Sequence, residues 1–447
     1  MVVHRRGVSG RCSPFLLFRP RRSGLLLTIY AVIFLLSIIA LISKMRVKQY
    51  LPAALSAMPT FVQSAFPGPE DTVDPFEVYT ISAENITANL IPYGARLTSL
   101  LVPDRSGTLQ DVVVGFDDPL EYLHNVQTGN AYLGPIVGRY ANRIKNGTFK
   151  VDGIEYHIGE NENADALHGG PIGYDQYNWT VTSHSESTIT FTLRDHAYGG
   201  FPGDTITHAT YAVDTSLSPA NPNGLPQLTT RLVSLSMTTK TPIMLANHIY
   251  WNLNAFNEAN VLSDILHLPL SKRYVGTDGN LIPNGAILDV AESDHGVMDF
   301  TSGKAIGRDL RYAEGVCGTQ CTGYDNCFIT DRPWYSSPSS MVPILKLQSN
   351  TTGIALEVTT NQPALQIYTC NGMKGTIPVR PSQVKRNIEA GKGGANFIQK
   401  YGCIVIETEG WIDGINQPQW GQDSSQIFSP QEFPAVNLAT YQFGLLN

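Results

Sequence analysis

Much of the chain beyond residue 75 alternates apolar and polar positions with a period of two. Residues 188–193 read TITFTL, and similar alternation recurs in residues 354–358 and 365–367. In residues 233–238 the apolar set of the alternation is Val233, Leu235 and Met237. Successive side chains of a β-strand point to opposite faces, so each pattern predicts a strand with one buried face.

The elements predicted after residue 75 are many short strands, because no long amphipathic pattern is evident there. The 40 glycines and 28 prolines also favour short elements over long helices. We therefore predict an all-β domain over residues 76–447, built as a large antiparallel sandwich. Residues 214–228, 331–342 and 382–400 are expected to be surface insertions. The chain contains no P-loop, no dinucleotide fingerprint and no nucleophile-elbow motif.

An apolar run of nineteen residues without a charge covers residues 24–42. As a helix it would nearly span a hydrocarbon core of roughly 30 Å. Six arginines precede the run and three basic residues follow it, so residues 1–23 are predicted to be a cytoplasmic tail and residues 24–42 a transmembrane signal anchor. Residues 43–75 would form a stalk, and the rest would lie in the lumen or outside the cell. A cleaved signal, with a secreted product, stays open because small residues follow at Ala53, Ala54 and Ala57.

Four N-x-S/T sequons agree with this topology and are candidate glycosylation sites: Asn85, Asn146, Asn178 and Asn350. Of the six cysteines, Cys12 falls in the predicted cytoplasmic tail, which leaves an odd number outside. Within the cluster Cys317, Cys321 and Cys327 one disulfide of undetermined pairing is expected. The cluster contains no histidine and no second cysteine pair, so it is a poor zinc site.

Charge separates the chain into two parts. Nine of the 31 Lys and Arg residues lie in residues 1–48, which contain no Asp or Glu, so residues 49–447 hold 22 basic and 38 acidic side chains, a net charge of −16. Binding to phosphate backbones needs a basic surface. Nucleic acid is therefore excluded as a partner.

Three polar residues lie in surroundings that suit chemistry. His168 precedes two glycines, which allow another group to approach the backbone closely, and His248 ends an apolar run. In the strand pattern GCIVIETEGW, Glu407 shares a face with Cys403 and Val405. Whichever face is buried, Glu407 ends an apolar strand, so desolvation is expected to raise its pKa and make it a better base near neutrality.

Several segments, in a fixed order, resemble the aldose 1-epimerase (galactose mutarotase) family from about residue 76 to the C-terminus. They are GARLTSLLVPDRSG at 94–107, DVVVGFDD at 111–118, GRYANRIKNGTFKVDGIEY at 138–156, LHGG at 167–170, NHIYWNL at 247–253, GYDNCF at 323–328, QPALQIYTCNG at 362–372 and IETEGWIDGINQP at 406–418. The ordered set is far more specific than any one of these segments.

The resemblance implies a β-supersandwich that interconverts the α and β anomers of free hexoses without a cofactor or a metal. Matched to the motifs, it implies Glu407 as general base, His248 as general acid in the imidazolium form and His168 as an assisting group. It also implies that the sugar is contacted by Asn142, Arg143, Tyr250, Asp325 and Gln366. The oligomeric state is not predicted.

Three positions depart from the family pattern: Trp251, Asn326 and Glu409, where Phe, His and Gln are usual. None removes an implied proton-transfer group. A hexose-phosphate epimerase is a second reading, but the net charge of −16 argues against a phosphate ligand. A non-catalytic sugar-binding sandwich is a third, and the presence of all three proton-transfer residues counts against it. A glycoside hydrolase would need a second carboxylate opposite Glu407, and none is assigned.

Overall fold

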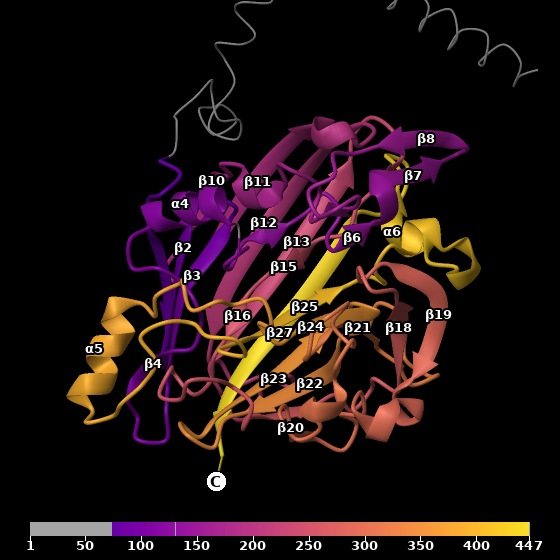
Figure 1. The fold of residues 1–447 in the computed structure, drawn as a ribbon. Coiled ribbons are helices and arrows are strands. Elements are labelled where there is room, and N and C mark those ends of the chain that lie inside the picture. The colour runs from indigo at the N-terminus through magenta and orange to yellow at the C-terminus, as the bar shows by residue number, and fades with distance from the viewer. Residues whose placement is uncertain (1–73, 130, 447) are drawn as a thin grey trace, which may run out of the picture. The chain divides into compact units, whose positions relative to one another are not determined.

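The structure is a computed structural model that describes residues 74–129 and 131–446 (Figure 1). The predicted tail, the predicted anchor and nearly all of the predicted stalk lie outside these residues. Within the described ranges, no helix is both long and apolar enough to cross a membrane.

A nine-stranded antiparallel sheet forms the largest layer. Its strand order is β10 (Thr180–His184), β11 (Thr188–His196), β12 (Asp204–Asp214), β13 (Gln227–Ser236), β27 (Ala435–Leu445), β23 (Ile354–Thr360), β22 (Val342–Gln348), β17 (Ile265–His267) and β20 (Lys304–Ala305). The C-terminal strand β27 lies between β13 and β23, and Figure 1 shows it as the long yellow arrow. The last strand of the chain therefore joins two halves of the sheet.

A six-stranded antiparallel sheet carries part of the candidate site. Its order is β16 (Tyr250–Trp251), β25 (Ile404–Glu409), β24 (Ala364–Tyr368), β21 (Asp325–Ile329), β18 (Arg273–Thr277) and β19 (Pro283–Asp289). A four-stranded sheet is made of β1 (Tyr79–Ala83), β2 (Ile86–Ile91), β3 (Arg96–Pro103) and β4 (Leu109–Asp111).

Short pairs and helices complete the described fold. The two-stranded pairs are β5 (Ile136–Val137) with β15 (Ala246–Asn247), β6 (Arg143–Ile144) with β9 (Ala166–Leu167), β7 (Thr148–Val151) with β8 (Ile154–His157), and β14 (Thr241–Pro242) with β26 (Ile427–Phe428). The α-helices of the described ranges are α4 (Leu120–Thr128), α5 (Pro381–Glu389) and α6 (Asp423–Gln426). The 3₁₀ turns are Lys145–Gly147, Tyr174–Gln176, Tyr198–Gly200, Val290–Glu292, Asp294–Gly296, Leu310–Tyr312, Gly414–Asn416 and Pro418–Trp420. The all-β fold class predicted from the sequence is confirmed.

Strand β25 is buried on both faces. Ile404 and Ile406 belong to the main core, together with side chains of the nine-stranded sheet, and Thr408 Oγ1 donates a 3.2 Å hydrogen bond to Asn437 on β27. On the opposite face, Cys403 and Val405 belong to a second apolar cluster. The division of this strand into two faces follows the sequence expectation, and the face that carries Glu407 is enclosed by protein.

The alternation in β11 and β23 matches the observed burial, but the expectation for β13 is confirmed only for Val233. Ser234 and Ser236 are buried there, whereas Leu235 is 38% exposed and Met237 just beyond the strand is 53% exposed. Ser234 pairs with Thr207 of β12 through a 2.8 Å hydroxyl–hydroxyl hydrogen bond. A buried hydroxyl costs little once it is hydrogen-bonded. Alternation in the sequence could not tell which face of this strand is covered.

The segment 382–400 was expected to be a surface insertion, and this is wrong in part. Its first half belongs to α5, whose Gln383 and Asn387 are buried. Gln383 accepts a 3.0 Å hydrogen bond from the backbone N–H of Asp111 and donates a 2.8 Å bond to Gln110. These bonds fasten α5 to β4. The segment 331–342, by contrast, exposes Trp334 almost completely.

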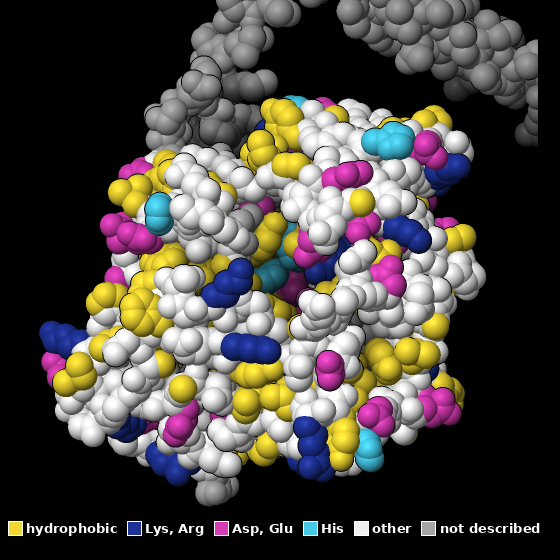
Figure 2. Space-filling model, viewed as in Figure 1, with side chains coloured by type: hydrophobic (Ala, Val, Ile, Leu, Met, Phe, Trp, Pro, Cys, Tyr) yellow, Lys and Arg dark blue, Asp and Glu magenta, His cyan; other side chains and the backbone are white. Residues whose placement is uncertain are grey.

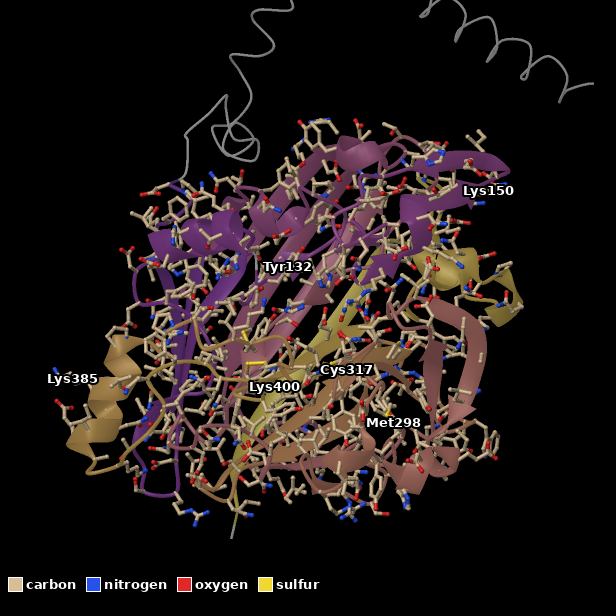
Figure 3. The ribbon with its side chains drawn as sticks, in the orientation of Figure 1. Tyr132, Lys150, Met298, Cys317, Lys385 and Lys400 are labelled. Carbon is tan, nitrogen blue, oxygen red and sulfur yellow. A yellow bond between two sulfur atoms is a disulfide. The ribbon has the colours of Figure 1, made fainter. Side chains whose placement is uncertain are left out.

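Two disulfides stabilise the described domain (Figure 3). Cys317 bonds Cys321, so the one disulfide expected in the cysteine cluster is confirmed, and Cys327 is free and buried. The second joins Cys370, just after β24, to Cys403, just before β25. It therefore ties together the ends of two neighbouring strands that lead to the candidate site.

Asp264 provides a test of the core. Burial raises the pKa of this carboxyl to about 7, with a Ser349 hydrogen bond opposing the shift. Because the folded pKa lies above the unfolded value of about 3.9, its stabilising contribution is present below that value and is lost as pH rises through the folded pKa. In the wild type this lowers the free energy of unfolding between about pH 4 and about pH 8. We expect Asp264→Asn to make that decrease smaller by on the order of 3 kcal/mol.

The measurement is urea unfolding at a series of pH values, with Asp294→Asn as control, since the Asp294 side chain is 74% exposed. An unchanged pH dependence in Asp264→Asn would contradict the buried, protonated state of Asp264.

Candidate active site

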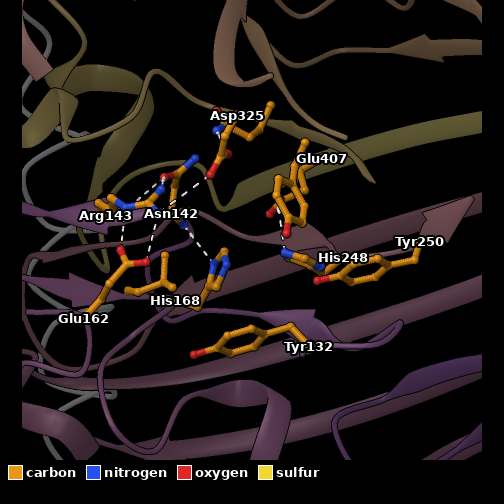
Figure 4. A pocket seen from close by; sticks show the side chains of 12 residues that line it. Tyr132, Asn142, Arg143, Glu162, His168, His248, Tyr250, Asp325 and Glu407 are labelled. Carbon is orange, nitrogen blue, oxygen red and sulfur yellow. Dashed lines mark hydrogen bonds and ion pairs between the residues drawn. The ribbon is translucent and has the colours of Figure 1, made fainter. Parts of the chain in front are cut away.

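A cavity of about 170 Å³ opens in the hollow seen in Figure 2, where histidine and acidic side chains are visible. Segments at β6, β9, β16, β21, β24 and β25 form its walls. The lining residues are Tyr132, Asn142, Arg143, Glu162, Leu167, His168, His248, Tyr250, Asp325, Gln366, Tyr368 and Glu407 (Figure 4). A second cavity of about 330 Å³ adjoins it and shares four of these residues, including Arg143 and Asp325.

Glu407 points into the cavity from β25, opposite Gln366 of β24. The residue is 2% exposed. Its Oε1 lies 3.5 Å from Nε2 of His248, and its Oε2 is buried with no hydrogen-bond partner. An unpartnered carboxylate oxygen is costly to bury, so this atom is suited to accept a hydrogen bond from a hydroxyl group of a ligand.

His248 lies where the chain changes partners. The preceding strand β15 pairs with β5, and the following strand β16 pairs with β25. Between them, the backbone N–H of His248 donates to Pro135 O at 2.9 Å, and its carbonyl accepts from Gly134 N at 3.0 Å. The backbone of His248 is therefore held on both sides, with its ring facing Glu407 (Figure 4).

His168 directly follows β9 and adopts a left-handed backbone with φ of 52°. The N–H of Asn142 donates a 3.1 Å hydrogen bond to its Nδ1. Because Nδ1 accepts, the neutral ring carries its proton on Nε2 and can donate from that atom. A Cβ on the next residue, Gly169, would lie 2.2 Å from the carbonyl oxygen of Gly138, so this turn requires glycine.

Arg143 is oriented by carboxylates. Its Nε and Nη2 bond the two oxygens of Glu162 at 2.5 and 3.0 Å, and its Nη2 lies 3.9 Å from Asp325 Oδ2. Asp325 in turn accepts a 2.6 Å hydrogen bond from Gln366 Nε2. Planar, bidentate pairing of this kind fixes the guanidinium geometry.

Burial decides the protonation of the site. It raises the pKa of Glu407 well above the ordinary glutamate range, and the charges of Glu409 and Asp325 act in the same direction. It lowers the pKa of His248 to about 3 and the pKa of His168 well below the usual histidine value. The raised pKa of Glu407 agrees with the sequence expectation. Both shifts favour the neutral forms of the pair, and the imidazolium role expected of His248 stays a prediction.

Comparison with known proteins identifies the family. A family model described as aldose 1-epimerase matches residues 77–436, which is most of the chain. The chain belongs to the aldose 1-epimerase family.

Relatives agree with this membership. A probable aldose 1-epimerase of Arthroderma benhamiae is 58% identical over 381 residues, covering 83% of this chain and 87% of that protein. The human galactose mutarotase is 28% identical, covering 77% of this chain and 88% of that protein. Among solved structures, a galactose mutarotase/aldose epimerase homologue from C. elegans superposes with a TM-score of 0.67 at 26% identity, covering 83% of this chain and 99% of that one.

All eight of the predicted catalytic and sugar-contacting residues line the one cavity of about 170 Å³. Their roles remain predictions. The sequence analysis missed Tyr132, Glu162, Leu167 and Tyr368. Leu167 lies in the LHGG motif and Tyr368 in the QPALQIYTCNG motif, so the family motifs were a usable signal. Glu162 lies in an acidic, polar run, and no feature of that run distinguishes it.

The three departures from the family pattern have different surroundings. Trp251 is buried in the main core, with its ring 5.1 Å from that of Tyr441. Asn326 donates a 3.0 Å hydrogen bond to Val316 O and does not line the cavity. Glu409 bonds Asn142, one of the lining residues.

A metal would have one candidate position in the described ranges. His168, His248 and Glu407 offer ligand atoms within 4.8 Å of one another. In the hydrogen-bonded tautomer of His168, however, Nδ1 is occupied and Nε2 carries the proton, so neither nitrogen has a free lone pair for a metal. The arrangement suits a donor hydrogen bond from His168 better than metal ligation.

The tautomer of His168 can be measured. We expect nitrogen NMR of the neutral ring near pH 7 to show Nε2 protonated and Nδ1 unprotonated, because the Asn142 N–H occupies Nδ1. The exposed His124 serves as control, since rings in solvent exchange freely between tautomers. A protonated Nδ1 on His168 would contradict the hydrogen bond described.

Proposed function

We propose that this chain is an aldose 1-epimerase that interconverts the α and β anomers of free hexoses such as glucose or galactose. The observation that carries the proposal is the Glu407–His248 contact of 3.5 Å in the cavity, with one buried carboxylate oxygen left unpartnered. Family membership supports the same activity.

The reaction needs one base and one acid. Glu407 takes the proton from the O1 hydroxyl while His248 gives a proton to the ring oxygen O5, and the C1–O5 bond breaks to leave an open-chain aldehyde. Rotation about C1–C2 presents the other face of the carbonyl. The same two groups then act in reverse to close the ring, so no proton, electron or group is gained or lost.

The reactive state requires the shared proton on His248. The raised pKa of Glu407 and the lowered pKa of His248 both favour the neutral pair. The 3.5 Å contact allows the proton to cross when sugar hydroxyls donate to the Glu407 carboxylate, since hydrogen bonds to the charged form lower a carboxyl pKa. His168 supplies a further N–H donor beside the reacting oxygens.

The remaining residues bind and orient the sugar. Arg143, fixed by Glu162, donates to hydroxyls, and Asp325 and Gln366 accept and donate from the adjoining strands. Tyr250 adds a buried ring. Asn142 bonds Glu409 and Arg143 and lines the cavity, and the second hydrogen of its Nδ2 can donate to a sugar hydroxyl. No cofactor or metal takes part in these steps.

A hexose phosphate fits the pocket less well. Arg143 is the one Lys or Arg among the lining residues, and Glu162 and Asp325 already compensate its charge. A dianionic phosphate would therefore meet more negative than positive charge. A free hexose is the better ligand.

Polarimetry of freshly dissolved α-D-glucose and α-D-galactose tests the proposal. We expect the full-length protein to speed the approach to equilibrium rotation, and Glu407→Gln to reduce the gain by about 10² to 10⁴-fold, the usual loss for a general base. Glu389→Gln is the matched control, because the Glu389 side chain at the end of α5 is exposed. A folded Glu407→Gln variant with full activity would sink the assignment, and no acceleration by the wild type would sink the activity.

We also propose that residues 24–42 anchor the domain in a membrane, with the domain on the lumenal or outer side. The nineteen uncharged residues with basic flanks support this, as does the exposure of all four sequon asparagines. We expect the protein to stay in the membrane fraction after an alkaline carbonate wash, and release into the wash would contradict the anchor.

We also expect glycosidase treatment to lower the mass of the protein, and an unchanged mass would contradict glycosylation.

A further inference from the structure

Glu409 is a buried carboxyl just behind the cavity. It ends β25, two residues beyond Glu407, and the two therefore share one face of the strand. The residue is fully buried and lies opposite Ala364 of β24. It does not line the cavity. Its Oε1 accepts a 2.8 Å hydrogen bond from Asn142 Nδ2, and its Oε2 is buried with no partner.

Asn142, held by this bond, connects to the groups that do line the pocket. Its Oδ1 accepts from the backbone N–H of Arg143 at 3.0 Å and from Nη1 of the same residue at 3.4 Å. Its own N–H donates to His168 Nδ1 at 3.1 Å. Asn142 has a left-handed backbone with φ of 57°, a conformation that asparagine adopts more readily than most residues. The hydrogen bond to Glu409 holds its Nδ2 atom.

We propose that Glu409 is a positioning residue of this site, which holds Asn142 by the 2.8 Å hydrogen bond and places a second carboxyl on the strand face of Glu407. Glu409 acts on Arg143 and His168 through Asn142, and it acts on Glu407 through its charge. The inference rests on the proposed function for its kinetic consequences, but the electrostatic link can be measured without any substrate.

The charge of Glu409 opposes ionisation of Glu407. Burial raises the pKa of Glu409 to about 8, and Glu409 is among the groups that raise the pKa of Glu407. The titratable and charged groups that face this carboxyl pair from the surrounding elements are Asp325, Arg143, His168, His248, Cys327, Tyr140, Tyr250 and Tyr441. Of these, Arg143 is the one permanent cation, and it is shared with Glu162 and Asp325. Loss of the Glu409 carboxyl should therefore let Glu407 ionise at lower pH.

Two variants separate the two effects. Glu409→Gln keeps an oxygen that can accept from Asn142 and removes the charge. We expect it to move the pH profile of kcat/KM to lower pH by about one unit, with KM little changed. Glu409→Leu removes the acceptor as well, so we expect a rise in KM of about tenfold in addition, because Arg143 and His168 lose their support. A KM that rises in Glu409→Leu but stays near the wild-type value in Glu409→Gln indicates a lost positioning contact rather than general damage to the fold.

Asp264→Asn is the matched control, because it also removes a buried carboxyl but lies outside the site, and its pH profile should equal that of the wild type. A Glu409→Gln profile that coincides with the wild-type profile overturns the electrostatic link. A Glu409→Leu variant that folds with unchanged KM overturns the positioning of Asn142.

Infrared titration of the protonated carboxyl bands tests the link without turnover. In wild-type protein, two buried glutamic acid bands should persist above about pH 6, and in Glu409→Gln the remaining Glu407 band should vanish about one unit lower. If the wild type shows no such bands, or the Glu407 band titrates identically in both proteins, the inference fails whether or not the protein is an epimerase. If the wild type is inactive but the bands shift as expected, the proposed function fails and the coupling stands.

Discussion

Burial of a carboxyl group inside β-sheet is the constraint on which the site depends. Glu407 is on a strand that is covered on both faces, by the main core on one side and by the cavity wall on the other. A carboxylate in that position loses most of its hydration, so its proton affinity rises and that of the neighbouring imidazole falls. Both shifts favour the neutral pair, and the 3.5 Å contact lets a proton pass from the carboxyl group to the imidazole, as acid–base ring opening requires.

The fold supplies the rigidity that this arrangement requires. β25 lies between β24 and β16 in the six-stranded sheet, and the Cys370–Cys403 disulfide joins the ends of β24 and β25. His248 lies between β15 and β16, which pair with different strands. His168 is held in a turn whose next position, Gly169, has room only for glycine. Positions fixed by backbone hydrogen bonds keep the reacting groups in place without depending on flexible loops.

The sequence revealed much of this because its signals were local. The two faces of β25, the apolar strand before Glu407 and the ordered family motifs predicted residues that the structure brings together in one cavity. The hydrogen bonds and ion pairs that hold the site residues in place could not be predicted, because they join residues far apart in the sequence. Asn142 and Glu409 are 267 positions apart, and the acidic run around Glu162 has no pattern that points to Arg143. The covered face of β13 was missed because residues 233–238 place serines on it, whereas its apolar residues, Leu228 and Leu232, lie earlier in the strand.

The account places the chemistry at the C1–O5 bond, with O1 retained by the sugar throughout. The most direct test uses hexose carrying a heavy oxygen isotope on O1, followed by carbon NMR, in which the isotope shifts the C1 signal of each anomer. The account expects the protein to convert one anomer to the other while both keep the label, apart from the slow exchange seen without protein. Loss of the label in step with conversion would contradict the account, in which O1 stays bonded to C1 throughout each turnover.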